Sequence, residues 1–371
     1  MCQNDGSSVT ALRPSQLGPP EVLAHVVDVH CHPTDSRISP EVMDSLPIRI
    51  CAMATRGNDQ ALVRNLAKEY PEKVIPCFGY HPWFSHWIAV DSVSKEEHYR
   101  SLFLGPSSKA EHTTAFERLL PYLPEPTLLD DIISEVRENL SAFPDAMLGE
   151  VGLDRACRIP YTSPALPPYV ENDSRRDLSP FTIPLSHQLA ILEAQIQLAI
   201  ELKRNVSFHS VKCQQTTVGL LNKLKAKHEE DWNAISVDMH SCGLSAETWR
   251  DIEKQHVNVF LSLSTVINSR SPAHRGLIAA CSPNRILVES DYNDAIHVTG
   301  QTWDMLQTIA EVKGWTVEES WVLEQDAAKW GAVRRLEENW KVFQAGRHQP
   351  QKRKDRRKPP LEDREGRTSQ T

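Results

Sequence analysis

Short runs rich in β-branched and other apolar residues alternate with longer segments of helical period between residue 25 and about residue 344. Parallel strands need long connections between them, usually helices, so this alternation favours a parallel sheet covered by helices. Eight strand candidates in this arrangement predict an α/β fold of the (β/α)8 TIM-barrel type. The candidate strands span residues 25–30, 48–53, 74–78, 146–149, 206–208, 234–239, 257–263 and 285–290.

The pattern predicts one barrel domain over residues 23–344. Two stretches within it, 85–127 and 155–182, are irregular and rich in proline, serine or charge, and we interpret both as insertions. The first is long for a barrel loop and is expected to shape access to the substrate. Residues 1–22, rich in Ser, Pro, Gly and Gln, are expected to form a mobile tail. Helical segments with several tryptophans are expected from about 301 to 344.

Residues 345–371 differ in composition from the rest of the chain. They contain the basic run Gln351-Lys-Arg-Lys-Asp-Arg-Arg-Lys358, followed by two prolines, and too few apolar residues to fold alone. We expect a disordered basic tail. Two interpretations of it stay open, a nuclear-localisation signal or nucleic-acid tether, and a solvated tail without a specific role.

Charge and cysteine content restrict the class of protein. The formal net charge of −8 excludes a surface that is basic throughout, but it permits a local basic site for an anionic substrate. The eight cysteines form no Cys-x-x-Cys pair, which indicates a reducing compartment without disulfides or a cysteine-built zinc site. No apolar run approaches the roughly 20 residues of a membrane span, and no signal-peptide pattern is present. We therefore expect a location in the cytoplasm, the nucleus or both, without a membrane partner.

Histidines and carboxylates stand where a barrel enzyme carries its chemistry, at the C-terminal ends of the strands. His30 and His32 point to the same side of the first strand, because alternate residues share a face, so both can reach one ion. The other candidates follow the fourth, fifth, sixth and eighth strands, and they are Glu150, His209, His240 and Asp291. Imidazole nitrogen and carboxylate oxygen suit zinc, manganese or magnesium, so we predict a site for two divalent metal ions.

Each of these residues also has a simpler interpretation when taken alone. A single histidine at a strand end, such as His209 or His240, is more often a hydrogen-bonded polar residue or a cap than a ligand. Glu150 could be one partner of a buried ion pair, and Asp291 could cap the following helix. The metal site is favoured because all six residues occupy the positions that a barrel active site uses.

The chemistry expected of such a site is hydrolysis. Two metals about 3.5–4 Å apart can share a hydroxide and clamp a phosphoryl oxygen. Glu150 is expected to bridge them, since its carboxylate can offer one oxygen to each ion. Asp291 is also expected to orient or deprotonate the attacking water. The remaining expected ligands are His30 and His32 with Asp291 for the first metal, and His209 and His240 for the second.

These residues, in their order and spacing, resemble the TatD-type metal-dependent deoxyribonucleases, within the amidohydrolase-like barrels. The resemblance covers most of residues 25–295 and implies a (β/α)8 barrel that hydrolyses phosphodiester bonds in DNA, typically as a magnesium-dependent 3′–5′ exonuclease. The matching motifs are Asp28-Val-His-Cys-His32, Gly79-Tyr-His-Pro-Trp83, Gly149-Glu-Val-Gly-Leu-Asp154, the helix around Gln188 and Gln195, Phe208-His-Ser210, His240 and Pro283-Asn-Arg-Ile-Leu-Val-Glu-Ser-Asp291.

The resemblance implies that the same six residues bind metal. It further implies that His81 lies near the substrate phosphate, although His81 could equally be a structural loop residue held by Pro82 and Trp83. Asp154 is expected to support the site without being a ligand.

The chain departs from the family pattern at three loops. His240-Ser241-Cys242-Gly243 is one residue shorter than the usual His-x-Phe-Ser-Gly and lacks its Phe. Val211 and Lys212 stand where an Arg commonly follows the His-Ser of the fifth strand, and Ser290-Asp291-Tyr292-Asn293 replaces Thr-Asp-x-Pro. Metal binding is therefore better supported than the identity of the substrate.

Three functions remain in competition. The leading one is a TatD-like deoxyribonuclease with DNA as its substrate. The second is a lactonase-like or amidase-like hydrolase on the same barrel, but such relatives often carry a carboxylated lysine after the fourth strand, where this chain has Glu150. The third is an interaction module that binds a protein partner through the insertions or the basic tail.

Overall fold

The computed structural model describes residues 17–169, 177–322 and 324–349, and the structural statements below concern these residues. Its centre is a parallel sheet of seven strands, each paired with the next in chain order, as a barrel requires. In sheet order the strands are β1 (Val27–Cys31), β2 (Arg49–Met53), β3 (Val74–Phe78), β6 (Met147–Asp154), β9 (Val206–Val211), β10 (Val237–Met239) and β11 (Val259–Leu261).

Residues 285–292, which include the predicted eighth strand, close this sheet into a barrel without forming a regular strand. Leu287 N donates to Leu261 O in β11 at 2.7 Å, and Asp291 N donates to His30 O in β1 at 2.9 Å. Backbone hydrogen bonds therefore join the last strand to the first, and the predicted (β/α)8 barrel is confirmed. The predicted sixth strand begins too early, because Ala234 still belongs to a helix.

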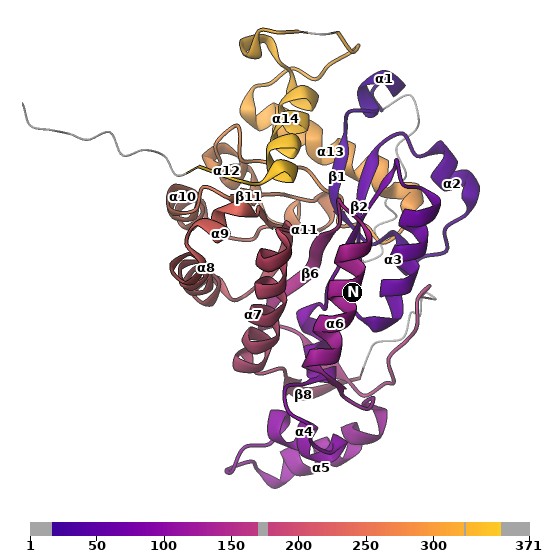
Figure 1. The fold of residues 1–371 in the computed structure, drawn as a ribbon, viewed down its shortest axis with the longest axis vertical. Helices are drawn as coiled ribbons and strands as arrows, with labels where there is room; N and C mark the ends of the chain where they lie inside the picture. The colour runs from indigo at the N-terminus through magenta and orange to yellow at the C-terminus, as the bar shows by residue number, and fades with distance from the viewer. Residues whose placement is uncertain (1–16, 170–176, 323, 350–371) are drawn as a thin grey trace, which may run out of the picture.

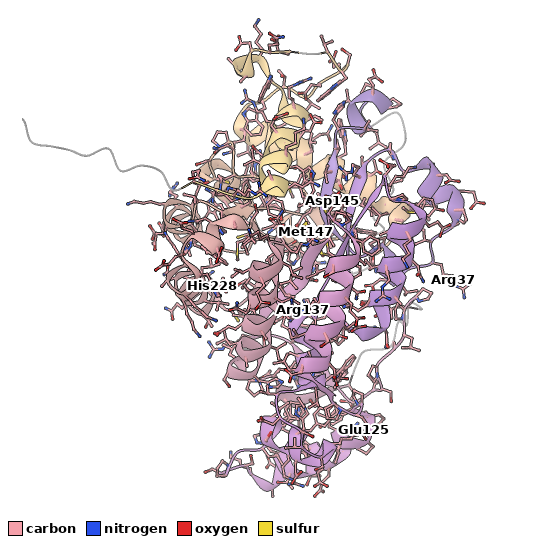
Figure 2. The ribbon with its side chains drawn as sticks, in the orientation of Figure 1. Arg37, Glu125, Arg137, Asp145, Met147 and His228 are labelled. Atoms are coloured by element: carbon pink, nitrogen blue, oxygen red, sulfur yellow. The ribbon has the colours of Figure 1, made fainter. Side chains whose placement is uncertain are left out.

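Helices cover the outside of the barrel (Figure 1). On α7, for example, Leu192, Ile196 and Ala199 recur at helical spacing and are buried. Arg137 on α6, labelled in Figure 2, forms an ion pair with Glu201 on α7 at 2.8 Å. No helix in the described part of the chain is long and apolar enough to span a membrane. The long helices are α3 (Gly57–Glu69), α6 (Leu129–Ala142), α7 (Leu185–Leu202), α8 (Gln214–His228), α10 (Ala246–Gln255), α12 (Ala273–Ala280), α13 (Ala295–Lys313) and α14 (Ala332–Ala345).

Short helical segments complete the connections between strands. They are α2 (Pro40–Ser45), α9 (Glu230–Ala234), α11 (Thr265–Asn268), η2 (Pro33–Asp35), η3 (Pro82–Trp87), η4 (Leu120–Tyr122) and η5 (Ala327–Lys329). The helical region expected from about 301 to 344 is divided into α13 and α14. Helix α13 ends at Lys313 because Gly314 adopts a left-handed conformation with a φ of 67°, which costs glycine little.

Apolar cores lie on both sides of the strands. Cys51, Met53 and Met147 belong to the core that fills the barrel, whereas Ile50 and Ala52 pack in the core under the helices. This division follows from the two-residue period of a strand. Because side chains fill the barrel interior, the chemistry is confined to the ends of the barrel.

The expectation that residues 85–127 and 155–182 are irregular is wrong for their described parts. The first contains β4 (Ile88–Ala89), α4 (Lys95–Phe103), α5 (Ala110–Leu119) and η4, and β5 (Thr127–Leu128) begins at its last residue. The second contains β7 (Arg158–Pro160) and β8 (Leu178–Thr182). Helix α4 begins where Ser94 and Glu97 cap each other's backbone. That these segments are insertions into a barrel domain stays a prediction.

The two segments together form an accessory unit, described over residues 88–128, 158–169 and 177–183, with a small core of its own. Tyr99 and Phe116 from the first segment pack with Ile159 and Phe181 from the second. Figure 1 shows α4 and α5 at the lower end of the molecule, where Figure 2 labels Glu125. The unit follows the C-terminal ends of β3 and β6, so it emerges at the end of the barrel that carries the candidate site.

The boundaries expected for the two tails are wrong for the residues next to the barrel. Helix α1 (Pro20–Leu23) precedes β1, and Val22 is fully buried. At the other terminus, Arg347 N donates to Ala234 O and His348 N donates to Asn233 O. Burial and backbone hydrogen bonds thus order both ends of the fold. Residues 1–16 and 350–371, including the basic run, lie outside the described residues.

Candidate metal centre

Side chains from several strands meet at the C-terminal end of the barrel, where the sequence places the candidate ligands. His30 lies in β1 and His32 just after it, Glu150 lies in β6 and His209 in β9. His240 follows β10, and Asp291 belongs to the segment that closes the barrel. Three overlapping groups have potential ligand atoms within 4.8 Å of one another, and they are His30 with His240 and Asp291, His30 with His32 and Glu150, and His81 with Glu150 and His209.

Glu150 lies at the centre of this cluster, and its two carboxylate oxygens face different histidines. Oε2 lies 3.3 Å from His32 Nε2 and 3.6 Å from His30 Nε2. Oε1 lies 2.8 Å from His209 Nδ1 and 3.0 Å from His240 Nε2. The carboxylate therefore divides the four histidines into two pairs, one on each oxygen.

Asp291 lies on the side of the first pair. Its Oδ1 is 3.7 Å from His30 Nε2 and 3.6 Å from His32 Nε2. The alternative that Asp291 caps the following helix is wrong, because Asp294 is the capping residue of α13 and accepts a hydrogen bond from Ile296 N. Asp291 is thus available to the cluster.

The outer ring nitrogens of three histidines contact groups behind the cluster. A histidine that binds metal through one nitrogen usually directs the other toward a carboxylate or another polar group, which fixes the ring orientation. The inner nitrogens of these rings are left facing Glu150. The outer contacts are His30 Nδ1 with Ser207 Oγ at 2.7 Å, His209 Nε2 with Asp154 Oδ2 at 3.4 Å, and His240 Nδ1 with Glu289 Oε1 at 3.5 Å.

His81 belongs to the cluster but has a different hydrogen-bonding pattern. Its Nδ1 accepts a hydrogen bond from Trp83 N at 3.0 Å, so the neutral ring carries its proton on Nε2. That Nε2 lies 3.2 Å from Glu150 Oε1. Burial, reinforced by the neighbouring His209, lowers the pKa of His81 to about 4. The ring is therefore suited to donate a hydrogen bond rather than to bind a metal through Nε2.

Carboxylate charge sets the electrostatics of the cluster. Burial by itself would lower the pKa of His240, but Glu150 and Glu289 raise it well above its ordinary value. Burial likewise opposes the rise in the pKa of His32, which Asp291 and Glu150 cause. A field that holds protons on buried imidazoles also attracts a divalent cation, and the rings would bind that cation in their neutral form. The donor set therefore fits a divalent metal.

Asp154 supports His209, in the role expected from the sequence. Its Oδ2 accepts a hydrogen bond from Trp83 Nε1 at 2.5 Å, and its Oδ1 accepts one from Ala156 N at 2.6 Å. These donors hold the carboxylate beside the outer nitrogen of His209, so Asp154 orients the ring without joining the cluster.

Sequence reasoning assigned no role to several buried residues behind the site. Asp28 accepts hydrogen bonds from His30 N at 3.1 Å and Ser290 N at 3.0 Å, which ties β1 to the closing segment. Glu289 is fully buried and accepts a hydrogen bond from Ser241 N at 2.7 Å. A signal existed for both carboxylates, because an acidic residue inside an apolar strand must have specific partners.

Comparison with known proteins identifies the family. A family model described as "TatD related DNase" matches residues 27–329, a range that includes every candidate ligand. The chain belongs to this family. The resemblance drawn from the motifs is thereby confirmed, and the protein is a metal-dependent hydrolase of the TatD family.

Two TatD-family relatives are similar over most of their length. The Cut9-interacting protein scn1 of Schizosaccharomyces pombe is 31% identical over 330 residues, which cover 80% of this chain and 95% of the relative. The uncharacterised deoxyribonuclease YMR262W of Saccharomyces cerevisiae is 29% identical over 280 residues, covering 72% of this chain and 83% of the relative.

Two solved structures have the same fold. The TatD homologue YJJV of Escherichia coli K12 matches with a TM-score of 0.51 at 15% identity, over 86% of this chain and 98% of its own. A TatD-family hydrolase of Entamoeba histolytica matches with a TM-score of 0.51 at 12% identity, over 82% of this chain and 87% of its own. At these identities the likeness concerns the fold alone, and it agrees with the barrel described above.

Proposed function

We propose that this TatD-family protein is a deoxyribonuclease that hydrolyses phosphodiester bonds with two divalent metal ions. The observation that carries the proposal is the division of the Glu150 carboxylate, with Oε2 beside His30 and His32 and Oε1 beside His209 and His240. A carboxylate in this position can offer one oxygen to each of two ions, which suits magnesium, manganese or zinc. The proposed ligands are His30, His32, Glu150, His209, His240 and Asp291.

The residues around the cluster can divide the chemical work. Two bound ions would lower the pKa of a water molecule and neutralise charge on the phosphoryl oxygens. Burial would raise the pKa of Asp291, but His32 and the other nearby histidines hold it at about 2, so the carboxylate is ionised and can accept a proton from the attacking water. His81 can donate its Nε2 proton to a phosphoryl oxygen, which would position the substrate.

The surroundings of the site favour an anionic substrate. Arg155 N donates to Val211 O at 3.1 Å, which places Arg155 beside Lys212 at the ends of β6 and β9. Neither of these two side chains forms a hydrogen bond or an ion pair within the described part of the chain. Lys212 stands close to the position where the family pattern has an Arg. Two cations without partners beside His209 suit the phosphates of a nucleic acid better than a neutral lactone or amide.

A nuclease assay on the full-length protein tests the proposal. With added Mg²⁺ or Mn²⁺ the protein should cleave single-stranded or double-stranded DNA, and chelation of the metal should abolish the cleavage. A protein that binds metal, leaves both forms of DNA intact and hydrolyses a lactone or an amide would contradict it.

A second candidate function, an interaction module, has one specific observation in its favour. Large apolar side chains are exposed on the accessory unit, among them Val90, Val93, Tyr122, Leu166 and Leu178. The S. pombe relative is named as a Cut9-interacting protein, so a protein partner is a reasonable proposal for this chain as well. If the biological role is binding alone, the double variant His30→Ala/His32→Ala should retain it. A location in the cytoplasm or nucleus stays a prediction.

A further inference from the structure

Ser241 has an unusual backbone conformation directly after the candidate ligand His240. Its φ is 41°, in the left-handed region that serine seldom adopts because its β-carbon approaches the backbone there. The loop that contains it is one of the places where this chain departs from the TatD pattern. A serine where glycine would be less strained directs attention to what its side chain contacts.

The turn brings two donors of Ser241 to one carboxylate oxygen. The backbone N–H donates to Glu289 Oε1 at 2.7 Å, and the hydroxyl donates to the same oxygen at 2.6 Å. The other oxygen of Glu289 accepts a hydrogen bond from Ser262 Oγ at 2.5 Å. Glu289 Oε1 also lies 3.5 Å from His240 Nδ1, the outer nitrogen of that ring. Ser241 therefore helps to fix the carboxylate that stands behind His240.

The same hydroxyl reaches a second carboxylate. Ser241 Oγ lies 3.3 Å from Asp291 Oδ2 and 2.7 Å from Ser264 Oγ. A hydroxyl has one proton, so Ser241 can donate to Glu289 or to Asp291 but not to both at once, and Ser264 can donate to Ser241 in turn. Ser241 thus contacts carboxylates beside both histidine pairs, the two halves of the cluster. Glu289 lies behind His240, and Asp291 Oδ1 faces His30 and His32.

We propose that Ser241 is a positioning residue that couples the two halves of the metal centre. On one side it holds Glu289 behind His240, and on the other it restrains the Asp291 carboxylate. The proposal rests on the two-metal site proposed above and names a determinant of its geometry. Removal of the hydroxyl takes away the one donor that Glu289 and Asp291 share, so metal binding should weaken in both halves together.

Two substitutions separate the hydroxyl from the turn. Ser241→Ala removes the hydroxyl and keeps the strained backbone, whereas Ser241→Gly removes the hydroxyl and relieves the strain. Both variants of the full-length apo protein should bind Mn²⁺ about 10-fold more weakly than wild type in a calorimetric titration. Ser241→Gly should denature in urea at no lower concentration than wild type. Ser245→Ala is the matched control, because Ser245 lies in the same loop but caps α10, accepting from Thr248 N at 3.1 Å.

The outcomes distinguish a positioning role from a structural one. If Ser241 only forms the turn, Ser241→Gly will bind Mn²⁺ like wild type, and that result would overturn the proposal. Wild-type affinity in Ser241→Ala would overturn it too. If Ser241→Ala does not fold, Ser241→Gly carries the test alone. Wild-type protein that binds Mn²⁺ but does not cleave DNA refutes the proposed nuclease and leaves the Mn²⁺ comparison valid.

Discussion

Oε1 of Glu150 lies 2.8 Å from Nδ1 of His209, and the two side chains come from the adjacent strands β6 and β9. The other oxygen, Oε2, faces His32, which directly follows β1. One carboxylate therefore touches ligand candidates that lie 177 residues apart in sequence, from His32 to His209. The two halves of the cluster meet at this side chain.

Substitution of Glu150 by glutamine should disable both halves. The amide keeps the size of the side chain but has only one oxygen, and its NH₂ group would face one histidine pair. We expect Glu150→Gln to lose at least about 100-fold in DNA cleavage with Mg²⁺ or Mn²⁺, because removal of a group behind the ligands alone costs 10–100-fold. Circular dichroism should show a folded protein. A folded variant with wild-type cleavage would contradict the bridging role.

The close approach of β6 and β9 depends on Gly152. A β-carbon at this position would lie 2.0 Å from the backbone oxygen of His209, and no side-chain rotation can relieve a contact with backbone. Gly152→Ala should therefore lower the free energy of unfolding by about 1–3 kcal/mol and weaken Mn²⁺ binding by moving His209. Urea denaturation and a Mn²⁺ titration measure the two effects.

Gly219→Ala is the control for this substitution. Gly219 lies within α8, and a β-carbon there would meet no atom within 4 Å, so alanine should stabilise the protein by up to about 1 kcal/mol. If Gly152→Ala and Gly219→Ala have equal free energies of unfolding, the backbone of Gly152 and the backbone oxygen of His209 do not approach closely enough to exclude a β-carbon.

The free energy of unfolding should decrease at acid pH, in part because of His86. Burial, reinforced by the nearby His187 and His98, lowers the pKa of His86 to about 3 in the folded protein. In the unfolded chain the pKa of a histidine is about 6.5. Between these values the unfolded chain binds more protons than the folded one, so this contribution is complete above pH 6.5 and is lost as the pH falls toward 3, by up to about 1.4 kcal/mol per unit. His86→Gln should reduce the slope of unfolding free energy against pH between 6.5 and 4.5. An unchanged slope would refute this assignment.

The cations beside the site should contribute to affinity for DNA. Arg155→Ala/Lys212→Ala should raise KM for DNA and reduce the slope of log affinity against log salt by about 1 for each phosphate contact removed. Lys68→Ala/Lys254→Ala provides a matched double variant, because these exposed lysines lie in the last turns of α3 and α10. Identical salt slopes for the two double variants would count against a phosphate contact at Arg155 and Lys212.

The barrel and the meeting of its candidate ligands could be predicted from the sequence because both depend on local periodicity. His30 and His32 share a face of one strand, and the same alternation predicts that Cys31 between them points away into packing. That expectation is confirmed, since Cys31 is fully buried in the core under the helices.

Features that depend on contacts between distant segments escaped prediction. The accessory unit acquires its core only when Phe103 of one segment stacks on Phe181 of the other, and neither segment alone has a long apolar pattern. Ser241 acquires its place through Glu289, 48 residues further along the chain. The burial of Val22 likewise depends on the folded barrel and not on the composition of the N-terminal residues.

The number of metal ions bound per chain tests the central claim most directly. Elemental analysis and Mn²⁺ titration of the full-length protein should give two ions per chain, and His30→Ala/His32→Ala should bind about one, because the His209 and His240 side remains. One ion or none in the wild-type protein, or two in the double variant, would contradict a centre that is divided by Glu150.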